Sequence, residues 1–163
     1  MRILLLVPLL VLLAACGGDS SPAKLNIGMV APSFDARHVD GMPARAAAWS
    51  GKPLVIRFWA DWCKFCEGEM QAIDKVYKRL KPRGLEVIAI NAGQDSKTVA
   101  AFMQKIGVSY PALLDEQSAI AKSYGVVGLP TTYFVDAKGI VRAKLVGEAD
   151  VASFERAALE ILK

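Results

Sequence analysis

The most constraining feature of the sequence is an apolar run that leads into two closely spaced cysteines and then into an amphipathic stretch. The run "KPLVIRFWA" (52–60) is rich in β-branched and aromatic residues, which predicts a buried central strand. After Cys63 and Cys66, apolar residues recur at three- and four-residue spacing as far as Leu80, which predicts a helix. The fold must therefore contain a strand, a Cys-x-x-Cys turn and a helix in that order.

The rest of the chain continues this alternation of strands and helices. A turn signal at Asp40-Gly41 predicts a small hairpin within residues 31–49. Ser96 is expected to cap a helix that ends at Gly107. Further strands are expected at 85–91, 111–114, 131–135 and 140–146, and further helices at 96–106, 117–124 and from Asp150 onward. Parallel strands followed by an antiparallel pair predict an α/β sandwich.

The N-terminal residues have the pattern of an export signal followed by a tether. Residues 1–15 carry one positive charge and an apolar run too short to span a membrane as a stable helix, which is typical of a secretory signal. Leu13-Ala14-Ala15-Cys16 resembles the lipobox of bacterial lipoproteins, so Cys16 is expected to be lipidated; the alternative is a chance cysteine beside an ordinary cleavage site. Residues 16–24 then form a lipidated flexible tether, and the folded domain covers 25–163.

Export and charge together restrict the partners. Without residues 1–15 the chain has 19 basic and 16 acidic side chains, a net charge of +3, and no run of basic residues interleaved with aromatics. We therefore expect no nucleic acid partner and a monomer held on the extracytoplasmic (periplasmic) side of a membrane by its lipid. In that oxidising compartment a cysteine pair forms a disulfide unless something keeps it reduced.

The placement of the cysteine pair at a helix start suits thiol–disulfide exchange. Cys63 is predicted to face the unpaired N–H groups and the positive dipole end, which stabilise a thiolate, while Cys66 lies one turn behind. Such placement lowers a thiol pKa from ~8.5 into the range of ~3.5 to 7.5. Cys63 would attack a partner and Cys66 would resolve the mixed disulfide.

The sequence resembles a known family over most of its length. "FWADWCKFC" and "GLPTTYFVDAKG", together with "APSF" and "EVIAINAG", are similar to the TlpA/ResA-like branch of membrane-anchored oxidoreductases in the thioredoxin superfamily, over about residues 28–160. The resemblance implies a thioredoxin-like three-layer fold with an N-terminal β-hairpin and a central strand–helix insertion. It also implies that Cys63 is an exposed nucleophile, that Cys66 is the resolving thiol, and that Pro130 is cis.

The same resemblance implies the surroundings and partners of the pair. The loop at Pro130 would offer backbone groups to a partner's extended chain, and the residue before it would influence which partners fit. The active-site neighbours would be Trp62, Lys64, Phe65, Leu129 and Thr131. No cofactor is implied. The expected partners are a membrane dithiol electron donor and a client protein, such as apocytochrome c during cytochrome c maturation, a copper-site assembly protein or a methionine sulfoxide reductase.

The sequence departs from the family pattern between and before the cysteines. Many relatives carry proline where this chain has Phe65, which restores a backbone N–H and adds an apolar face. Lys64 either favours the Cys63 thiolate by its charge or is a solvated surface lysine. Arg57 occupies the position where thioredoxin keeps a buried acid, and an arginine cannot shuttle protons. We hypothesise that Arg57 pairs with Glu69; alternatively Arg57 extends to solvent and Glu69 complements the helix N-terminus.

A cysteine pair can also bind a metal or belong to a peroxidase. A structural zinc site needs four ligands, and His38 is the single histidine, so we expect no metal site of that kind. A copper-binding metallochaperone-type lipoprotein using the two soft thiolates is the alternative function. A peroxiredoxin-like peroxidase is disfavoured because the signature Pro-x-x-x-[Thr/Ser]-x-x-Cys does not precede Cys63.

Overall fold

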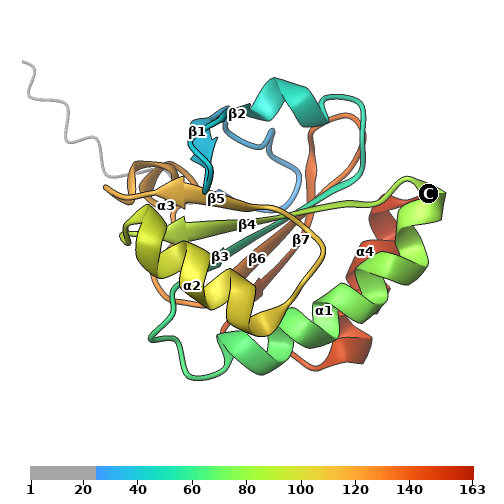
Figure 1. The fold of residues 1–163 in the computed structure, drawn as a ribbon. Coiled ribbons are helices and arrows are strands. Elements are labelled where there is room, and N and C mark those ends of the chain that lie inside the picture. Colours follow the sequence, from blue (N-terminus) through green and yellow to red (C-terminus); the bar gives the residue numbers. More distant parts are fainter. Residues whose placement is uncertain (1–24) are drawn as a thin grey trace, which may run out of the picture.

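The computed structural model describes residues 25–163, which form one mixed β-sheet covered by helices (Figure 1). The predicted signal peptide, the lipidation site Cys16 and the tether lie outside the described residues. The strands are β1 (Asp35–His38), β2 (Pro43–Arg45), β3 (Leu54–Trp59), β4 (Glu86–Ala92), β5 (Ala112–Asp115), β6 (Thr131–Val135) and β7 (Val141–Val146). The helices are α1 (Cys66–Leu80), α2 (Ser96–Ile106), α3 (Ala119–Ser123) and α4 (Val151–Ile161), with short 3-10 turns η1 (Ala46–Trp49) and η2 (Lys81–Arg83).

The strand order explains how the cysteine turn reaches the centre of the molecule. Across the sheet the order is β2-β1-β5-β4-β3-β6-β7, with β3, β4 and β5 parallel to one another and the flanking pairs antiparallel. All six residues of β3 are buried, as expected for a central strand. The thioredoxin-like architecture is confirmed, including the N-terminal hairpin, the C-terminal hairpin and the β4–α2 insertion between α1 and β5.

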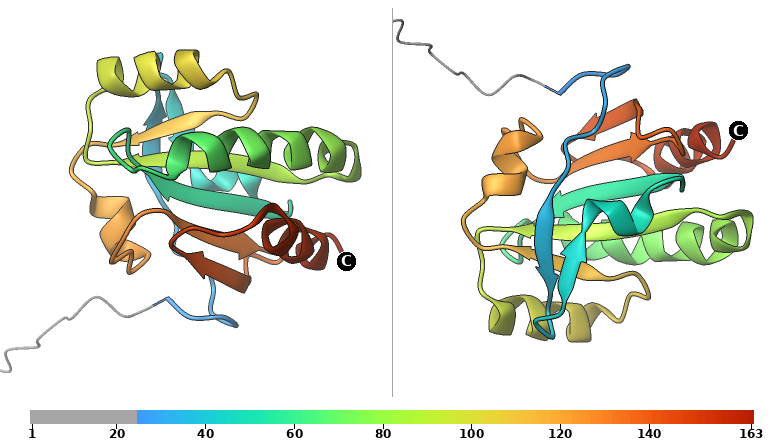
Figure 2. Two further views of the ribbon diagram at one scale, coloured as in Figure 1. Left: turned by 90° about the horizontal axis from the view of Figure 1, so that it is seen from below. Right: turned by 90° about the horizontal axis from the view of Figure 1, so that it is seen from above.

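The two faces of the sheet bury different elements. Val55 and Trp59 point to a cluster that includes the apolar faces of α1, α2 and α4. Ile56 and Phe58 point to a second cluster, which includes α3 and the segment around Phe34. Figure 2 shows α1, α2 and α4 in front of the sheet from below, and the β1-β2 hairpin with η1 from above. The result is three layers with β3 in the middle.

The predicted strand boundaries agree with the structure to within two residues, whereas α3 and the cap of α2 differ from the prediction. The helix expected at 117–124 spans only Ala119–Ser123, because the Asp115 carboxylate accepts the N–H groups of Ile120 and Ala121 and fixes where the helix begins. The cap of α2 is Asp95 rather than Ser96; its carboxylate accepts the N–H of Thr98. None of the helices within residues 25–163 is long and apolar enough to cross a membrane.

Candidate active site

The two cysteines occupy the junction between β3 and α1. Cys66 is the first residue of α1, and Cys63 lies in the turn before it. Backbone hydrogen bonds shape this turn: the N–H of Cys63 donates to the carbonyl of Ala60 (3.2 Å) and the N–H of Cys66 to the carbonyl of Cys63 (3.0 Å). The cysteines form a disulfide with their Cα atoms 5.4 Å apart. The turn therefore holds both sulfur atoms within bonding distance, as exchange chemistry requires.

The cysteines differ in how much of each is exposed. Cys63 is 7% exposed and Cys66 is fully buried at 0%. The exposed nucleophile implied by the family resemblance is thus mostly covered in this disulfide state, because Cys63 joins the same apolar cluster as Cys66. Of the two, only Cys63 has surface that a partner can reach.

Two exposed aromatic residues flank Cys63 in the sequence. Trp62 is 70% exposed and Phe65 is 44% exposed, directly before and two residues after Cys63. Lys64 is exposed, and its Nζ lies 5.6 Å from the centroid of the Phe65 ring. The residues between the cysteines therefore present a cation and an aromatic ring outward.

The loop at Pro130 has the conformation that the resemblance implied. The Leu129–Pro130 peptide bond is cis, which confirms that prediction. The loop is held by the N–H of Gly147, which donates to the carbonyl of Pro130 (2.8 Å), and by the hydroxyl of Thr131, which donates to the carbonyl of Gly128 (2.7 Å). Leu129 is half-buried and packs against the cluster that contains both cysteines.

Arg57 and Glu69 form a buried ion pair beneath this region. Arg57 Nη2 lies 2.6 Å from Glu69 Oε2, and the two side chains are 3% and 13% exposed. Arg57 Nη1 also donates to the hydroxyl of Thr132 (3.0 Å), and Glu69 Oε1 accepts the N–H of Ala149 (2.7 Å). The hypothesis that Arg57 pairs with Glu69 is confirmed. Sequence reasoning missed Thr132 and Ala149, which join β6 and the start of α4 to the pair.

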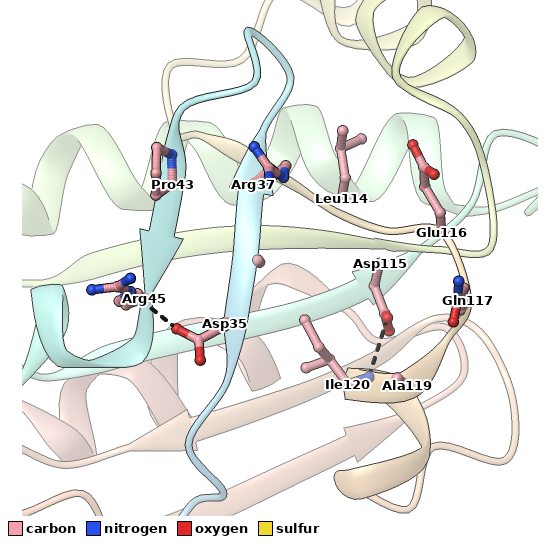
Figure 3. A pocket seen from close by; sticks show the side chains of 11 residues that line it. Asp35, Arg37, Pro43, Arg45, Leu114, Asp115, Glu116, Gln117, Ala119 and Ile120 are labelled. Atoms are coloured by element: carbon pink, nitrogen blue, oxygen red, sulfur yellow. Dashed lines mark hydrogen bonds and ion pairs between the residues drawn. The ribbon is translucent and has the colours of Figure 1, made fainter.

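The described residues hold no candidate metal centre, and the groove with a large volume lies away from the cysteine pair. Among residues 25–163 no three His, Cys, Asp or Glu side chains gather in a way that could hold a metal ion. A groove of about 710 Å³ lies elsewhere, between the β1-β2 hairpin and the β5–α3 segment (Figure 3). It contains the Asp35–Arg45 ion pair (3.3 Å) and none of the residues around the cysteines.

The fold and the cysteine pair together define a class. A thioredoxin-like sheet, a Cys-x-x-Cys disulfide at the start of α1 and a cis-proline before β6 are the parts of a thiol–disulfide oxidoreductase.

Comparisons with known proteins agree with that class. A model of the AhpC/TSA family matches residues 27–144, and the chain belongs to this family. It is 32% identical over 154 residues to thiol-disulfide oxidoreductase ResA of Geobacillus kaustophilus (strain HTA426), covering 91% of this chain and 88% of ResA. It is 30% identical over 145 residues to ResA of Bacillus subtilis (strain 168), covering 85% and 81%.

Solved structures give the same result. A putative thiol:disulfide interchange protein DsbE from Chlorobium tepidum has a TM-score of 0.81 and 25% sequence identity, covering 86% of this chain and all of that chain. A thioredoxin family thiol:disulfide interchange protein from Chlorobium tepidum TLS has a TM-score of 0.74 and 30% identity, covering 83% and 97%. The likeness extends over nearly the whole described domain.

Proposed function

We propose that this protein is an exported, lipid-anchored reductase of disulfides in client proteins. The observation that supports it most is the unequal exposure of the pair, 7% for Cys63 and 0% for Cys66. A reductase of this kind needs one sulfur that a client can reach and a second that remains shielded until the mixed disulfide has formed. The disulfide present in the structure is the product state of such a reaction.

The proposed reaction balances as two successive exchanges. The Cys63 thiolate attacks one sulfur of the client disulfide, so a Cys63–client disulfide forms and the other client sulfur leaves as a thiolate. Cys66 then loses its proton and attacks the Cys63 sulfur, which releases the second client thiolate and forms the Cys63–Cys66 disulfide. Two electrons pass to the client, and solvent protonates its thiolates. A membrane dithiol donor reverses both steps on this protein and restores the Cys63 and Cys66 thiols.

The residues around the pair have proposed roles in receiving the client. Trp62 and Phe65 offer apolar surface next to Cys63, and the backbone before and after Pro130 offers hydrogen-bonding groups to an extended segment. The Lys64 cation supports the Cys63 thiolate. Clients of the kind that the family resemblance implies are apocytochrome c, a copper-site assembly protein or an exported methionine sulfoxide reductase.

Anchoring at Cys16 is part of the proposal and rests on the sequence before the described domain. A short apolar segment that ends in Leu-Ala-Ala-Cys predicts cleavage and lipid attachment at that cysteine. In this proposal the lipid on Cys16 holds the folded domain at the membrane. Mass spectrometry of the protein from membranes would test this, and a Cys16→Ser variant found equally in the membrane fraction would contradict it.

The proposed reaction is tested by trapping its intermediate. A Cys66→Ala variant can form the mixed disulfide but cannot resolve it, so it should accumulate client proteins linked to Cys63 that a reducing agent releases. A Cys63→Ala variant is the matched control and should trap none. If Cys66→Ala recovers no partner under either reducing or oxidising growth, the exchange mechanism is wrong.

The direction of electron flow is tested by the reduction potential of the pair. A reductase should lie near the thioredoxin value of about −270 mV, whereas a disulfide donor lies near the DsbA value of about −120 mV. Equilibration with glutathione buffers measures it. A value close to that of DsbA would reverse the proposed direction, and stoichiometric Cu(I) retention without disulfide reductase activity would replace the proposal by copper binding.

A further inference from the structure

A set of hydrogen bonds joins the cysteine turn to the loop between β4 and α2. Asp61, two residues before Cys63, is held twice by Gln94: its N–H donates to Gln94 Oε1 (2.9 Å), and its Oδ1 accepts from Gln94 Nε2 (2.6 Å). Gln94 lies 33 residues away in the sequence. The Gln94 side chain therefore binds both the backbone N–H and the carboxylate of Asp61.

A buried side chain in turn holds Gln94 in place. Asn91 Nδ2 donates to Gln94 Oε1 (2.9 Å), and Asn91 is 0% exposed near the end of β4. On the neighbouring strand Asn91 is paired with Trp59, whose ring centroid lies 4.7 Å from that of Phe102 on α2. The hydrogen bonds to Asp61 are thus connected through Gln94 to a buried side chain at the end of β4.

The Asp61–Gln94 hydrogen bonds matter because few other bonds hold the chain between Asp61 and Cys63. Between the end of β3 and Cys66, the backbone bonds of the described structure are Cys63 to Ala60, Cys66 to Cys63, and Glu69 to the carbonyl of Phe65 (3.2 Å), and none of them involves Asp61. The N–H of Asp61 would face solvent without Gln94. Its carboxylate would also be free to rotate toward the Cys63 sulfur, where a negative charge disfavours the thiolate.

We propose that Gln94 is a positioning residue of the dithiol centre. It fixes the Asp61 turn so that the Cys63 sulfur is presented to a partner, and it keeps the Asp61 carboxylate away from the forming Cys63 thiolate. This inference deepens the proposed function and rests on Cys63 being the attacking group. Gln94 acts through Asp61 and does not touch the reacting atoms.

The pH dependence of Cys63 alkylation in the reduced full-length protein tests the role of Gln94. In Gln94→Ala, the midpoint of iodoacetamide reactivity should move upward by about half a pH unit, the effect of one carboxylate moved several ångströms closer in a solvated site. Below the midpoint this is about a threefold loss of thiolate. Gln94→Glu should shift the midpoint further, because it places a second carboxylate next to that of Asp61.

Two further variants separate positioning from general loosening of the fold. Gln71→Ala is the matched control: its Nε2 donates to the carbonyl of Ile106 (3.2 Å), so it also removes a glutamine that ties two elements together, but away from the cysteines. It should leave the alkylation midpoint unchanged. Adding Asp61→Asn to Gln94→Ala should return the midpoint toward the wild-type value, because the charge is gone.

The outcome that overturns the inference is a Gln94→Ala midpoint equal to those of the wild type and of Gln71→Ala. A failure of Asp61→Asn to restore the midpoint in the Gln94→Ala background would overturn the electrostatic part. Alkylation needs no client protein, so this test stands apart from the proposed function. A wild-type protein that reduces no client disulfide would refute the proposed function while the shift in Gln94→Ala remained measurable.

Discussion

Replacing Glu69 by glutamine removes one charge from the buried Arg57–Glu69 pair and changes little in size. Glu69 uses both carboxylate oxygens: Oε2 accepts from Arg57 Nη2 (2.6 Å) and Oε1 accepts the N–H of Ala149 (2.7 Å). Glutamine has one oxygen and one NH₂ group in their place. One of the two donors must therefore face the amide NH₂ group, and the Arg57 guanidinium loses its counter-charge.

The expected loss in unfolding free energy follows from this burial. The side chains of Arg57 and Glu69 are 3% and 13% exposed, so neither charge is well screened by water. Removing one partner of a buried ion pair costs about 3 to 5 kcal/mol, mostly because the other charge is left without compensation. Since the Thr132 hydroxyl keeps its bond to Arg57 Nη1, we expect the lower end, about 3 kcal/mol.

Urea unfolding of the reduced and oxidised protein measures this loss, and Glu67→Gln is the matched control. Glu67 lies on the same helix and pairs with Lys105 at the same 2.6 Å, but the side chains are 42% and 64% exposed. Exposed pairs contribute about 0 to 1 kcal/mol, so Glu67→Gln should unfold near the wild-type midpoint. The comparison isolates burial, because the ion-pair distance and the substitution are the same.

A loss for Glu69→Gln no larger than that for Glu67→Gln would refute the argument that burial makes this pair costly to break. The double variant Arg57→Met with Glu69→Leu is a further check, because replacing both charges by apolar groups is often neutral or stabilising. It should recover most of the stability that Glu69→Gln loses. The pH dependence of Cys63 alkylation in Glu69→Gln then shows whether Glu69 also tunes the pair; an unchanged profile means that its role is structural.

Two other predictions concern the cap of α4 and the independence of the two networks described above. Asp150 caps α4, and hydrogen bonds from the side chain and the backbone N–H of Ser153 (2.7 and 2.8 Å) hold the pKa of its carboxyl below the usual value. A carboxyl whose pKa is lowered by folding stabilises the folded protein at pH values above its unfolded pKa of ~3.9, and this stabilisation is lost as pH falls through the folded pKa. Asp150→Ala should therefore melt a few degrees lower than the wild type at neutral pH and at the same temperature as the wild type in acid. A difference in melting temperature that does not depend on pH would contradict this. The Gln94 network and the Arg57–Glu69 network share no residue, so the losses of unfolding free energy in Gln94→Ala and Glu69→Gln should add within about 0.5 kcal/mol in the double variant. A larger coupling would show that the networks act as one.

The parts of the site that could be predicted are those set by local periodicity. Alternation along β3 places Arg57 on the same face as Val55 and Trp59, and that face is the one covered by α1. Helical spacing places Glu69 one turn after Cys66, on α1. These two regular patterns place both residues on facing elements, and the resemblance of Glu69 to a glutamate near the thiols of ResA-like proteins then suggested the pair; periodicity alone left open that Arg57 extends to solvent.

The parts that could not be predicted depend on contacts between distant segments. Thr132 meets Arg57 across 75 residues, and Ala149 meets Glu69 across 80. The first contact requires that β6 lies beside β3, and the second requires that the segment before α4 lies beside α1; local sequence encodes neither arrangement. The cis bond before Pro130 was expected from family resemblance alone, because only about 5 to 6% of X-Pro bonds are cis. Asp95 and Ser96 are adjacent residues that can both cap a helix, so propensity could not separate them.

The exposure of the cysteines also constrains how the proposed reductase is recharged. In the disulfide state the buried Cys66 sulfur is closed to an attacking thiolate, so a donor must attack Cys63. In the reduced state the client must also bond to Cys63. Client and donor therefore meet the protein at the same surface, next to Trp62 and Phe65, and cannot occupy it together. The proposed mechanism thus requires alternating binding, in which the apolar surface beside Cys63 accepts two different proteins and the redox state of the pair decides which of them can react.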